Sequence, residues 1–353
     1  MTKRHQRRSY QVFQGLMTIS DQYRALRETA VIGAVSPRKT IGISGKDRAV
    51  YLQGLLTNDI QALAPGTGCY AAWLTPQGRM LTDLYVFESG DMILLDVPAG
   101  ELAGTMQRLD QFLFSEDVQF TDLSEALDAV WIHGPAGPSM LEQILKGASS
   151  GEAQVEPGSL YAWPEHHNAR VLFAGTPIVV ARVSQLGVPG FCVYVEAGWA
   201  AELERALVLV GAVAADPTVI EAARVEAGYP LFGVDMTAET IPLEAGIEGR
   251  AISLSKGCYV GQEVIIRVLH RGHGRVAKKL VALRVEGSVP VAGARIFAED
   301  RDVGVVTSAA DSPRLGSIAL GYVHRDFVSP GTGVAVDTPA GRAPAVVSDR
   351  PLA

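Results

Sequence analysis

The hydrophobic and polar positions in the first half of the chain predict short strands and helices joined by short connections. Pro76 and Gly78 occupy the second and fourth positions of a tetrapeptide typical of a type I turn between two strands. Asp47 is expected to cap a helix, and apolar residues at helical spacing predict a second helix further on. The expected elements are strands at 41–44, 69–74, 79–87, 92–97 and 129–133, helices at 47–56 and 100–113, and a helix start at 134–135. This order favours an α+β arrangement.

The second half of the chain changes its pattern at about residue 278. Before that point, strands are expected at 170–173, 178–183 and 191–195 and helices at 199–210 and after Asp216-Pro217, where an N-cap precedes a proline. After it, short alternating strands punctuated by glycine and proline predict a small β-barrel or sandwich. These strands are expected at 280–285, 295–298, 303–308 and 318–323. The small and polar segment 148–158 indicates a linker.

Composition and charge narrow the function classes. The chain has 353 residues, of which 48% are hydrophobic and 20% charged, which is ordinary for a soluble protein of two or three domains. A net charge of −7 argues against broad nucleic-acid binding. No apolar run approaches the roughly 18 residues of a membrane span, and no apolar signal core follows the basic N-terminus. We therefore expect a cytoplasmic protein with no nucleic-acid or membrane partner.

The three cysteines are isolated and odd in number. Cys69, Cys192 and Cys258 form neither a disulfide framework nor a zinc ligand set, which favours a reducing compartment. Three such thiols also make a poor permanent iron–sulfur site, so no permanent metal is expected.

The octapeptide 256–263, Lys-Gly-Cys-Tyr-Val-Gly-Gln-Glu, is the most distinctive segment. Gly257 and Gly261 flank the thiol of Cys258 and indicate a shaped loop. Lys256 could activate the thiol, as could a helix at 262–270 that has Glu263 in its first turn. Two alternatives stay open. Val-Ile-Ile-Arg-Val has strand propensity, and the loop could simply hold a small buried cysteine.

This octapeptide resembles the signature Lys-Gly-Cys-Tyr/Phe-x-Gly-Gln-Glu of the YgfZ family, folate-binding relatives of the glycine-cleavage aminomethyltransferase, the T-protein. The segments 45–60 and 224–228, the latter reading Arg-Val-Glu-Ala-Gly, also resemble T-protein elements. The resemblance covers roughly residues 36–350. It implies an α+β fold, with T-protein-like folate-binding domains followed by a small C-terminal β-barrel. The implied boundaries are a tail at 1–35, a folate-binding region at 36–275 with about 67–147 inserted into 36–66 plus 148–275, and a barrel at 276–353.

The resemblance also implies a function and a set of site residues. The function is support of the assembly or repair of iron–sulfur proteins, with tetrahydrofolate or a derivative as cofactor and iron–sulfur client or assembly proteins as partners. Cys258 is the expected reactive group, Lys256 its electrostatic activator and Asp83 a further catalytic residue. The expected cofactor contacts are Asp83, Arg224, Glu226, Tyr259, Gln262, Glu263 and Arg267.

Asp83 also stands out without the resemblance. In a strand over 79–87 it shares a face with Leu81, Tyr85 and Phe87, and a carboxylate among apolar neighbours needs a partner. The alternative is an aspartate in a solvent-facing gap, paired with Arg79. Folate-dependent one-carbon transfer passes through a cationic, iminium-like state, which a nearby carboxylate stabilises.

Two positions depart from the T-protein pattern. T-proteins read Gly-Gly-x-x-Asp-Asp where this chain has Thr82 before Asp83. They also carry a glutamate that grips the pterin ring, and Val188 stands at that position. Loss of such a charged partner costs about 1.5–3 kcal/mol.

Basic residues offer further sites. The guanidinium of Arg224 suits a folate carboxylate, or alternatively an ion pair with Glu221 or Glu226. A basic run could receive a polyglutamate tail or an acidic partner, or simply face solvent. This run comprises Arg267, His270, Arg271, His273 and Arg275. Alternatively, His270 and His273 could bind a metal together with Cys258.

Two competing functions remain open. A tetrahydrofolate-dependent aminomethyltransferase or demethylase is favoured by Asp83 and the Arg-Val-Glu-Ala-Gly element, and opposed by Val188 and the octapeptide. A non-catalytic scaffold would use the octapeptide as a docking surface.

Overall fold

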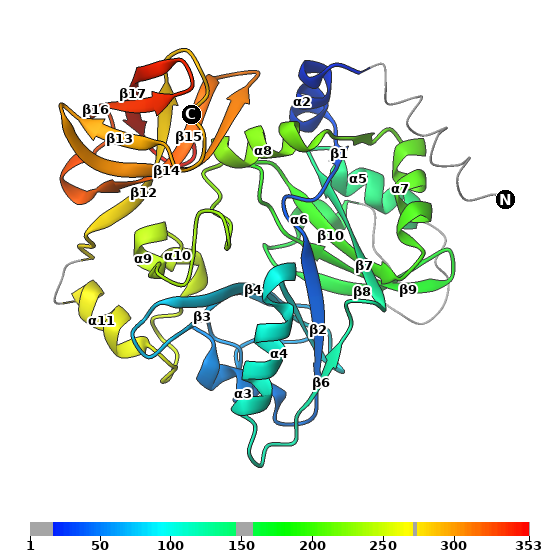
Figure 1. Cartoon of the computed structure of the whole chain (residues 1–353). Coiled ribbons are helices and arrows are strands. Elements are labelled where there is room, and N and C mark those ends of the chain that lie inside the picture. Colours follow the sequence, from blue (N-terminus) through cyan, green and yellow to red (C-terminus); the bar gives the residue numbers. More distant parts are fainter. Residues whose placement is uncertain (1–16, 146–157, 271–273, 353) are drawn as a thin grey trace.

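The computed structural model describes residues 17–145, 158–270 and 274–352, and within them two β-sheets with their helices and a β-barrel surround the middle of the molecule (Figure 1). The basic N-terminal residues and, apart from Gly158, the expected linker lie outside the described residues. No helix in the described part of the chain is long and apolar enough to cross a membrane.

The first sheet has five strands in the order β3-β4-β5-β2-β6. Two helices cover its outer face, where Leu52 and Leu109 pack against Ile43 and Leu95. The elements are β2 (Arg38–Ser44), α3 (Arg48–Leu55), β3 (Gly68–Leu74), β4 (Met80–Glu88), β5 (Ile93–Pro98), η1 (Ala99–Glu101), α4 (Leu102–Gln111) and β6 (Gln119–Asp122). The hydrophobic pattern predicted all of these except β6 and η1. Asp47 precedes α3 as expected, but its carboxylate accepts the backbone N–H of Asp117 instead of capping the helix.

The second sheet has six strands in the order β11-β1-β7-β10-β9-β8. Helices on its outer face pack Leu141 and Leu203 against Val130 and Val193. The strands are β1 (Val31–Ile32), β7 (Leu127–His133), β8 (Asn168–Phe173), β9 (Thr176–Arg182), β10 (Gly190–Glu196) and β11 (Val213–Ala214). The helices around it are α2 (Ile19–Glu28), α5 (Gly137–Leu145), α6 (Ser159–Ala162), α7 (Ala200–Leu209) and α8 (Pro217–Glu226).

The inner faces of the two sheets pack against each other. Tyr70, Tyr85 and Phe87 from the first sheet share one buried cluster with Trp131 and Tyr194 from the second. The ring centroids of Phe87 and Tyr194 lie 6.0 Å apart. Helices, sheet, sheet and helices therefore form four layers, and the side chains between the sheets are removed from water.

The C-terminal part is a closed barrel of six strands in the order β12-β15-β14-β13-β16-β17, which confirms the expected α+β fold with a C-terminal barrel. Helix α8 packs Ala222 and Val225 against Leu280 and Ile318 at its wall. The elements are β12 (Lys278–Val285), β13 (Arg295–Ala298), β14 (Arg301–Ser312), β15 (Gly316–His324), η2 (Arg325–Phe327), β16 (Gly333–Thr338) and β17 (Gly341–Ser348). The hydrophobic pattern did not predict the last two strands, β16 and β17.

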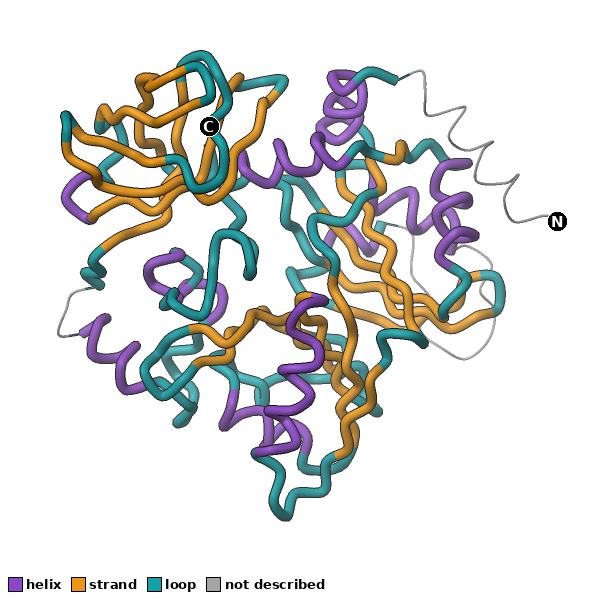
Figure 2. The backbone as a smooth tube through the Cα atoms, viewed as in Figure 1, coloured by secondary structure: helices purple, strands orange, loops and turns teal. Residues whose placement is uncertain are grey.

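A long connection joins α8 to the barrel. After α8 the chain runs as loop through the middle of the molecule and then forms three short helices (Figure 2). These are α9 (Pro242–Ala245), α10 (Glu248–Ala251) and α11 (Gln262–His270). Helix α11 settles the choice between helix and strand, because Ile265 on its apolar side enters the buried cluster between the sheets.

The folded body begins before residue 36, where the expected tail ends. Tyr23 and Leu26 of α2 are buried, and β1 pairs with both β7 and β11. The sheets also divide the chain differently from the expected insertion. Residues 38–122 supply the first sheet, and residues 31–32 with 127–214 supply the second. These pairings join segments far apart in the chain, so hydrophobic periodicity carries no signal of them.

Candidate active site

Asp83 lies on the inner face of β4 and is only 2% exposed. Its Oδ2 accepts a hydrogen bond of 2.7 Å from the hydroxyl of Tyr70, and its Oδ1 lies 3.4 Å from Nη1 of Arg38. The carboxylate thus has the partners that its burial requires. The alternative of a solvent-facing aspartate paired with Arg79 is wrong, because Arg79 pairs with Glu239.

A β-bulge corrects one part of the expected face. The pairing of β3 with β4 shifts between Trp73 and Leu74, so that Leu74 faces Met80 and Leu81 is skipped. Met80 therefore joins the inner cluster, while Leu81 packs on the outer face. The extra residue of a bulge reverses the alternation on one side of it.

A second buried carboxylate, Asp96 on β5, shares Arg38 with Asp83. Arg38 donates to Oδ1 of Asp96, and the hydroxyl of Tyr194 donates to Oδ2 at 2.6 Å. Burial raises the pKa of Asp96, although the positive charge of Arg38 opposes this. The sequence analysis missed Asp96, even though it interrupts the apolar run of β5 as Asp83 interrupts that of β4.

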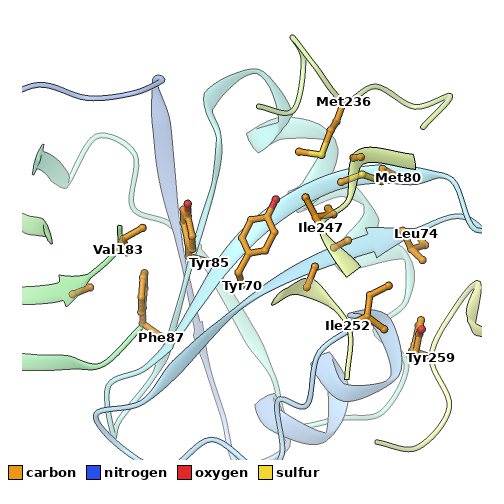
Figure 3. Close-up of a cluster of buried hydrophobic side chains, with 14 of the residues drawn as sticks. Tyr70, Leu74, Met80, Tyr85, Phe87, Val183, Met236, Ile247, Ile252 and Tyr259 are labelled. Atoms are coloured by element: carbon orange, nitrogen blue, oxygen red, sulfur yellow. The ribbon is translucent and has the colours of Figure 1, made fainter. Parts of the chain in front are cut away.

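A row of tyrosines continues from Asp83 toward the central loop. Tyr70 and Tyr85 face each other across β3 and β4, and Figure 3 shows their rings side by side with both hydroxyls at the same end. The hydroxyl of Tyr85 lies 2.5 Å from that of Tyr229. Arg250 stacks its guanidinium 3.9 Å from the ring of Tyr229 and 4.6 Å from that of Tyr70. Stacking of this kind holds a guanidinium in place without using its N–H groups.

Unpaired polar atoms surround the same tyrosines. Gln185 donates to the hydroxyl of Tyr85 at 2.7 Å, but its buried Oε1 has no hydrogen-bond partner among the described residues. Nδ1 of His166, whose ring lies 5.7 Å from that of Tyr85, is also buried without one. Burial lowers the pKa of His166 to about 4, with a further contribution from the charge of Arg250, so the ring is neutral near pH 7. A buried acceptor without a donor, such as Oε1 of Gln185, is suited to a ligand that brings N–H groups.

The positions that depart from the T-protein pattern do not take part in this site. Thr82 is buried, and its hydroxyl hydrogen-bonds to the backbone carbonyl of Asp83. Val188 packs in the cluster between α2 and α8. Gln185, three residues earlier in the same segment, does line this site, and its Oε1 is a buried acceptor without a partner in the described structure.

Arg224 and Glu226 tie α8 to its neighbours. Arg224 has no exposed surface, and its guanidinium binds Glu221, Asp235 and the hydroxyl of Ser308 in the barrel. The ion pair with Glu221 that the sequence left open is therefore present. Glu226 accepts from the hydroxyls of Tyr23 in α2 and Ser312 in the barrel, and pairs with Arg27. Both side chains hold the parts of the molecule together.

Lys256 is engaged away from the thiol. Its Nζ donates to the backbone carbonyls of Gln53, Leu56 and Asn58 at 2.6–2.8 Å. Burial lowers the pKa of this lysine to about 8, against the charge of Asp59. The thiol of Cys258 is not among the partners that the described residues give to Lys256, and Cys258 is exposed.

Within the rest of the octapeptide, Gly261 packs against the β3–β4 turn. Gly261 has a φ of +85°, and a Cβ there would lie 2.5 Å from the carbonyl oxygen of Thr75. Tyr259 is buried and its hydroxyl lacks a partner in the described structure, whereas Gln262 is half-buried. Gly78 in this turn precedes Asp83 by five residues, roughly 15 Å along a strand. The structure therefore groups the octapeptide at the turn and Asp83 with the tyrosines.

The remaining expected contacts lie on α11. Glu263, Arg267 and His270 are exposed. Arg271 and His273, named in the basic run and in the metal alternative, lie outside the described residues.

A cavity of about 410 Å³ opens between the central loop and the barrel. Tyr229, Arg250, Lys279 and Arg350 are among the residues that line it. Since Tyr229 and Arg250 also touch Tyr85 and Tyr70, this cavity adjoins the buried carboxylate.

Comparison with known proteins gives a consistent set of relatives. An aminomethyltransferase of Shouchella clausii (strain KSM-K16) is 30% identical over 95% of this chain and 89% of its own length. Aminomethyltransferases of Nostoc sp. (strain PCC 7120 / SAG 25.82 / UTEX 2576) and Bacillus subtilis (strain 168) are 28% and 25% identical over 95% and 91% of the chain, and over 87% and 86% of their own lengths. The glycine cleavage system aminomethyltransferase T of Bartonella henselae matches the fold with a TM-score of 0.81 at 21% identity, covering 96% of this chain and 90% of its own.

These relatives overturn the main function expected from the octapeptide. A role in assembly or repair of iron–sulfur proteins is contradicted, because proteins that match nearly the whole chain carry the name aminomethyltransferase. The expected function rested on the octapeptide, whereas the similarity to these aminomethyltransferases extends over 91–95% of the chain.

Two family models together account for most of the sequence. The GCVT N-terminal domain matches residues 8–256, and the glycine cleavage T-protein C-terminal barrel domain matches residues 278–353. The first spans the two sheets and the connection up to Lys256, and the second coincides with the closed barrel. The chain therefore belongs to the glycine cleavage T-protein family.

Proposed function

We propose that this protein is a tetrahydrofolate-dependent aminomethyltransferase whose reaction takes place beside Asp83. The observation that carries the proposal is the buried carboxylate itself, held between Tyr70 and Arg38 on a strand whose neighbours are aromatic. The names of the relatives that match nearly the whole chain support the same reading.

The residues around Asp83 fit a folate ring. Such a ring carries both N–H donors and ring-nitrogen acceptors; Oε1 of Gln185 is a buried acceptor and Nδ1 of His166 a buried ring nitrogen, and neither has a partner in the described structure. The tyrosine rings offer flat apolar surfaces for stacking. When bound, tetrahydrofolate supplies the nitrogen that accepts the one-carbon unit.

The protein contributes a fixed negative charge at the reacting centre. Tyr70 and Arg38 hold Asp83 in one orientation, so that little reorganisation is needed when positive charge develops on the one-carbon group. The aromatic layer between the two sheets excludes water, which strengthens that interaction. Asp96 keeps Arg38 partly neutralised, which leaves the site able to stabilise a cation.

Turnover of an aminomethyl donor in the presence of tetrahydrofolate tests the proposal. Asp83→Asn keeps the shape but removes the charge, and we expect kcat to fall on the order of a hundredfold. Asp91→Asn is the matched control, because Asp91 is exposed and pairs with Arg170 at the surface. Absence of turnover in the wild type, or equal rates in the two variants, would contradict the proposal.

A further inference from the structure

The first sheet places a buried arginine between its two inward-facing carboxylates. Strand β5 lies between β2 and β4, and Asp96 on β5 faces Thr40 on one side and Tyr85 on the other. Since residues two apart share a face of a strand, Arg38 on β2 and Asp83 on β4 lie on the same face as Asp96. Arg38 therefore reaches across β5 towards Asp83 and meets Asp96 on the way.

Arg38 is bound more closely to Asp96 than to Asp83. Its Nε donates to Oδ1 of Asp96, and its Nη2 donates to the backbone carbonyl of the same residue at 2.7 Å. Its contact with Asp83 is longer, with Nη1 at 3.4 Å from Oδ1. The guanidinium also lies 4.7 Å from the centre of the Tyr85 ring, and the side chain is 4% exposed. Arg38 is therefore held in an orientation in which its contact with Asp83 is long.

A side chain of the second sheet holds Asp96 from the other side. The hydroxyl of Tyr194 on β10 donates to Oδ2 of Asp96 at 2.6 Å, and Tyr194 is buried. Burial raises the pKa of Asp96, whereas the charge of Arg38 and this hydrogen bond both lower it. Tyr194 thus helps to keep the carboxylate charged, and a charged carboxylate holds a guanidinium more tightly than a neutral one. The contacts from Tyr194 through Asp96 and Arg38 to Asp83 form one chain that links the two sheets.

The length of the contact between Arg38 and Asp83 matters for a reaction that develops positive charge. A guanidinium that faces a carboxylate without competition closes to about 2.7–2.9 Å and often forms two parallel hydrogen bonds with it. Such a pair would offset the negative charge of Asp83 in a site that excludes water, where charges act strongly on one another. Because Asp96 occupies Arg38, the charge of Asp83 stays available to a cationic group.

We propose that Asp96 and Tyr194 are positioning residues for the transfer reaction, because together they keep Arg38 out of a close ion pair with Asp83. They act through Arg38, so a residue of the second sheet controls the charge that the first sheet presents to the one-carbon group. This inference rests on the proposed function, since it requires the reaction to take place beside Asp83.

Asp96→Asn tests the inference when it is made both in the wild type and in Asp83→Asn. The substitution keeps the shape of the side chain but releases Arg38 to pair with Asp83. We expect kcat for aminomethyl transfer to tetrahydrofolate to fall about tenfold to hundredfold in the wild type, with KM for tetrahydrofolate changed less than about twofold. In Asp83→Asn, where Arg38 has no charge to offset, the same substitution should change kcat less than about twofold. A purely structural effect would lower kcat by the same factor in both backgrounds.

Tyr194→Phe gives a second and milder test. It removes the hydroxyl but keeps both carboxylates, so we expect kcat to fall about threefold to tenfold in the wild type and to change less than about twofold in Asp83→Asn. Denaturant unfolding of each variant shows whether it is folded, and Tyr194→Phe carries the test if Asp96→Asn does not fold.

Two matched controls lie around the same sheet. Glu88→Gln removes a buried carboxylate of β4 that pairs with Arg48. Tyr51→Phe removes the hydroxyl of a buried tyrosine of α3, which donates to the carbonyl of Leu109. Both variants should keep the wild-type kcat, because these pairs lie outside the chain of contacts that links the two sheets to the site.

The outcomes separate this inference from the proposed function. A wild-type kcat in Asp96→Asn and Tyr194→Phe, beside a large loss in Asp83→Asn, would overturn the positioning role and leave the proposed function standing. Equal factors of loss in the wild-type and Asp83→Asn backgrounds would do the same. Absence of turnover in the wild type would overturn both.

Discussion

At the scale of single residues, burial changes the pKa of ionisable side chains, and His133 shows this clearly. His133 has no exposed surface; its Nε2 lies 3.1 Å from the carbonyl of Gly33, and its Nδ1 has no partner in the described structure. Burial lowers the pKa of His133 to about 4, against the small opposing effect of Gly33. The folded protein therefore keeps this ring neutral where an unfolded chain would protonate it.

The pH dependence of stability follows from that difference. Between about pH 6.5 and pH 4 the unfolded state binds a proton at His133 that the folded state does not, so stability falls as the pH falls. The contribution of His133 reaches up to about 3 kcal/mol at the acid end of this window. Urea unfolding at pH 7 and pH 5 should show a smaller loss for His133→Gln than for the wild type. His324→Gln, at the surface, should behave as wild type, and an equal loss in all three proteins would contradict the account.

At the scale of elements, residues 256–261 of the octapeptide form an irregular loop before α11, and Gly261 lies against the β3–β4 turn. Gly261 combines a φ of +85° with the close approach of Thr75, whereas a Cβ at Gly257 would meet no atom within 4 Å. We expect Gly261→Ala to lower the free energy of unfolding by about 1–3 kcal/mol and Gly257→Ala to have little effect. Denaturant unfolding of both variants measures this, and equal losses would show that the loop conformation is not what Gly261 provides.

The sequence predicted the helices and strands better than it predicted the tertiary contacts between them. Strands and helices followed from periodicity, and Asp83 stood out because a single charge interrupts an apolar strand. Arg38, Tyr229 and Arg250 carried no such signal, since their contacts join segments 45 to 180 residues apart, as from Arg38 to Asp83 and from Arg250 to Tyr70. The octapeptide led to a wrong expected function because a local motif carries no information about the residues that gather around Asp83. The reactivity expected of Cys258 stays a prediction.

At the scale of the whole molecule, α8 joins the parts that surround the site. Arg224 pairs with Asp235 in the central loop and with Ser308 in the barrel, and the side chains of Arg224 and Asp235 have no exposed surface. The central loop that this pair anchors carries Tyr229, which lines the proposed folate site. The geometry around Asp83 thus depends on contacts made far from it.

Removing the arginine leaves the buried carboxylate of Asp235 without its counter-ion, because its other donors, such as the backbone N–H of Leu231 and the hydroxyl of Thr307, are uncharged. We expect Arg224→Met to lower the free energy of unfolding by about 3–5 kcal/mol. Arg205→Met is the control, because Arg205 forms an exposed ion pair with Glu202 that contributes at most about 1 kcal/mol. Thermal or denaturant unfolding compares them, and losses of similar size would argue against a buried junction at α8.

Equilibrium titration of the purified protein with tetrahydrofolate, beside Asp83→Asn, tests the central claim most directly. The account predicts micromolar binding to the wild type and weaker binding to the variant, and a cooperative unfolding transition in each protein shows that both are folded. Binding that is indifferent to Asp83 would move the ligand away from the site between the sheets. Absence of binding would contradict the assignment of this protein as a folate-dependent transferase.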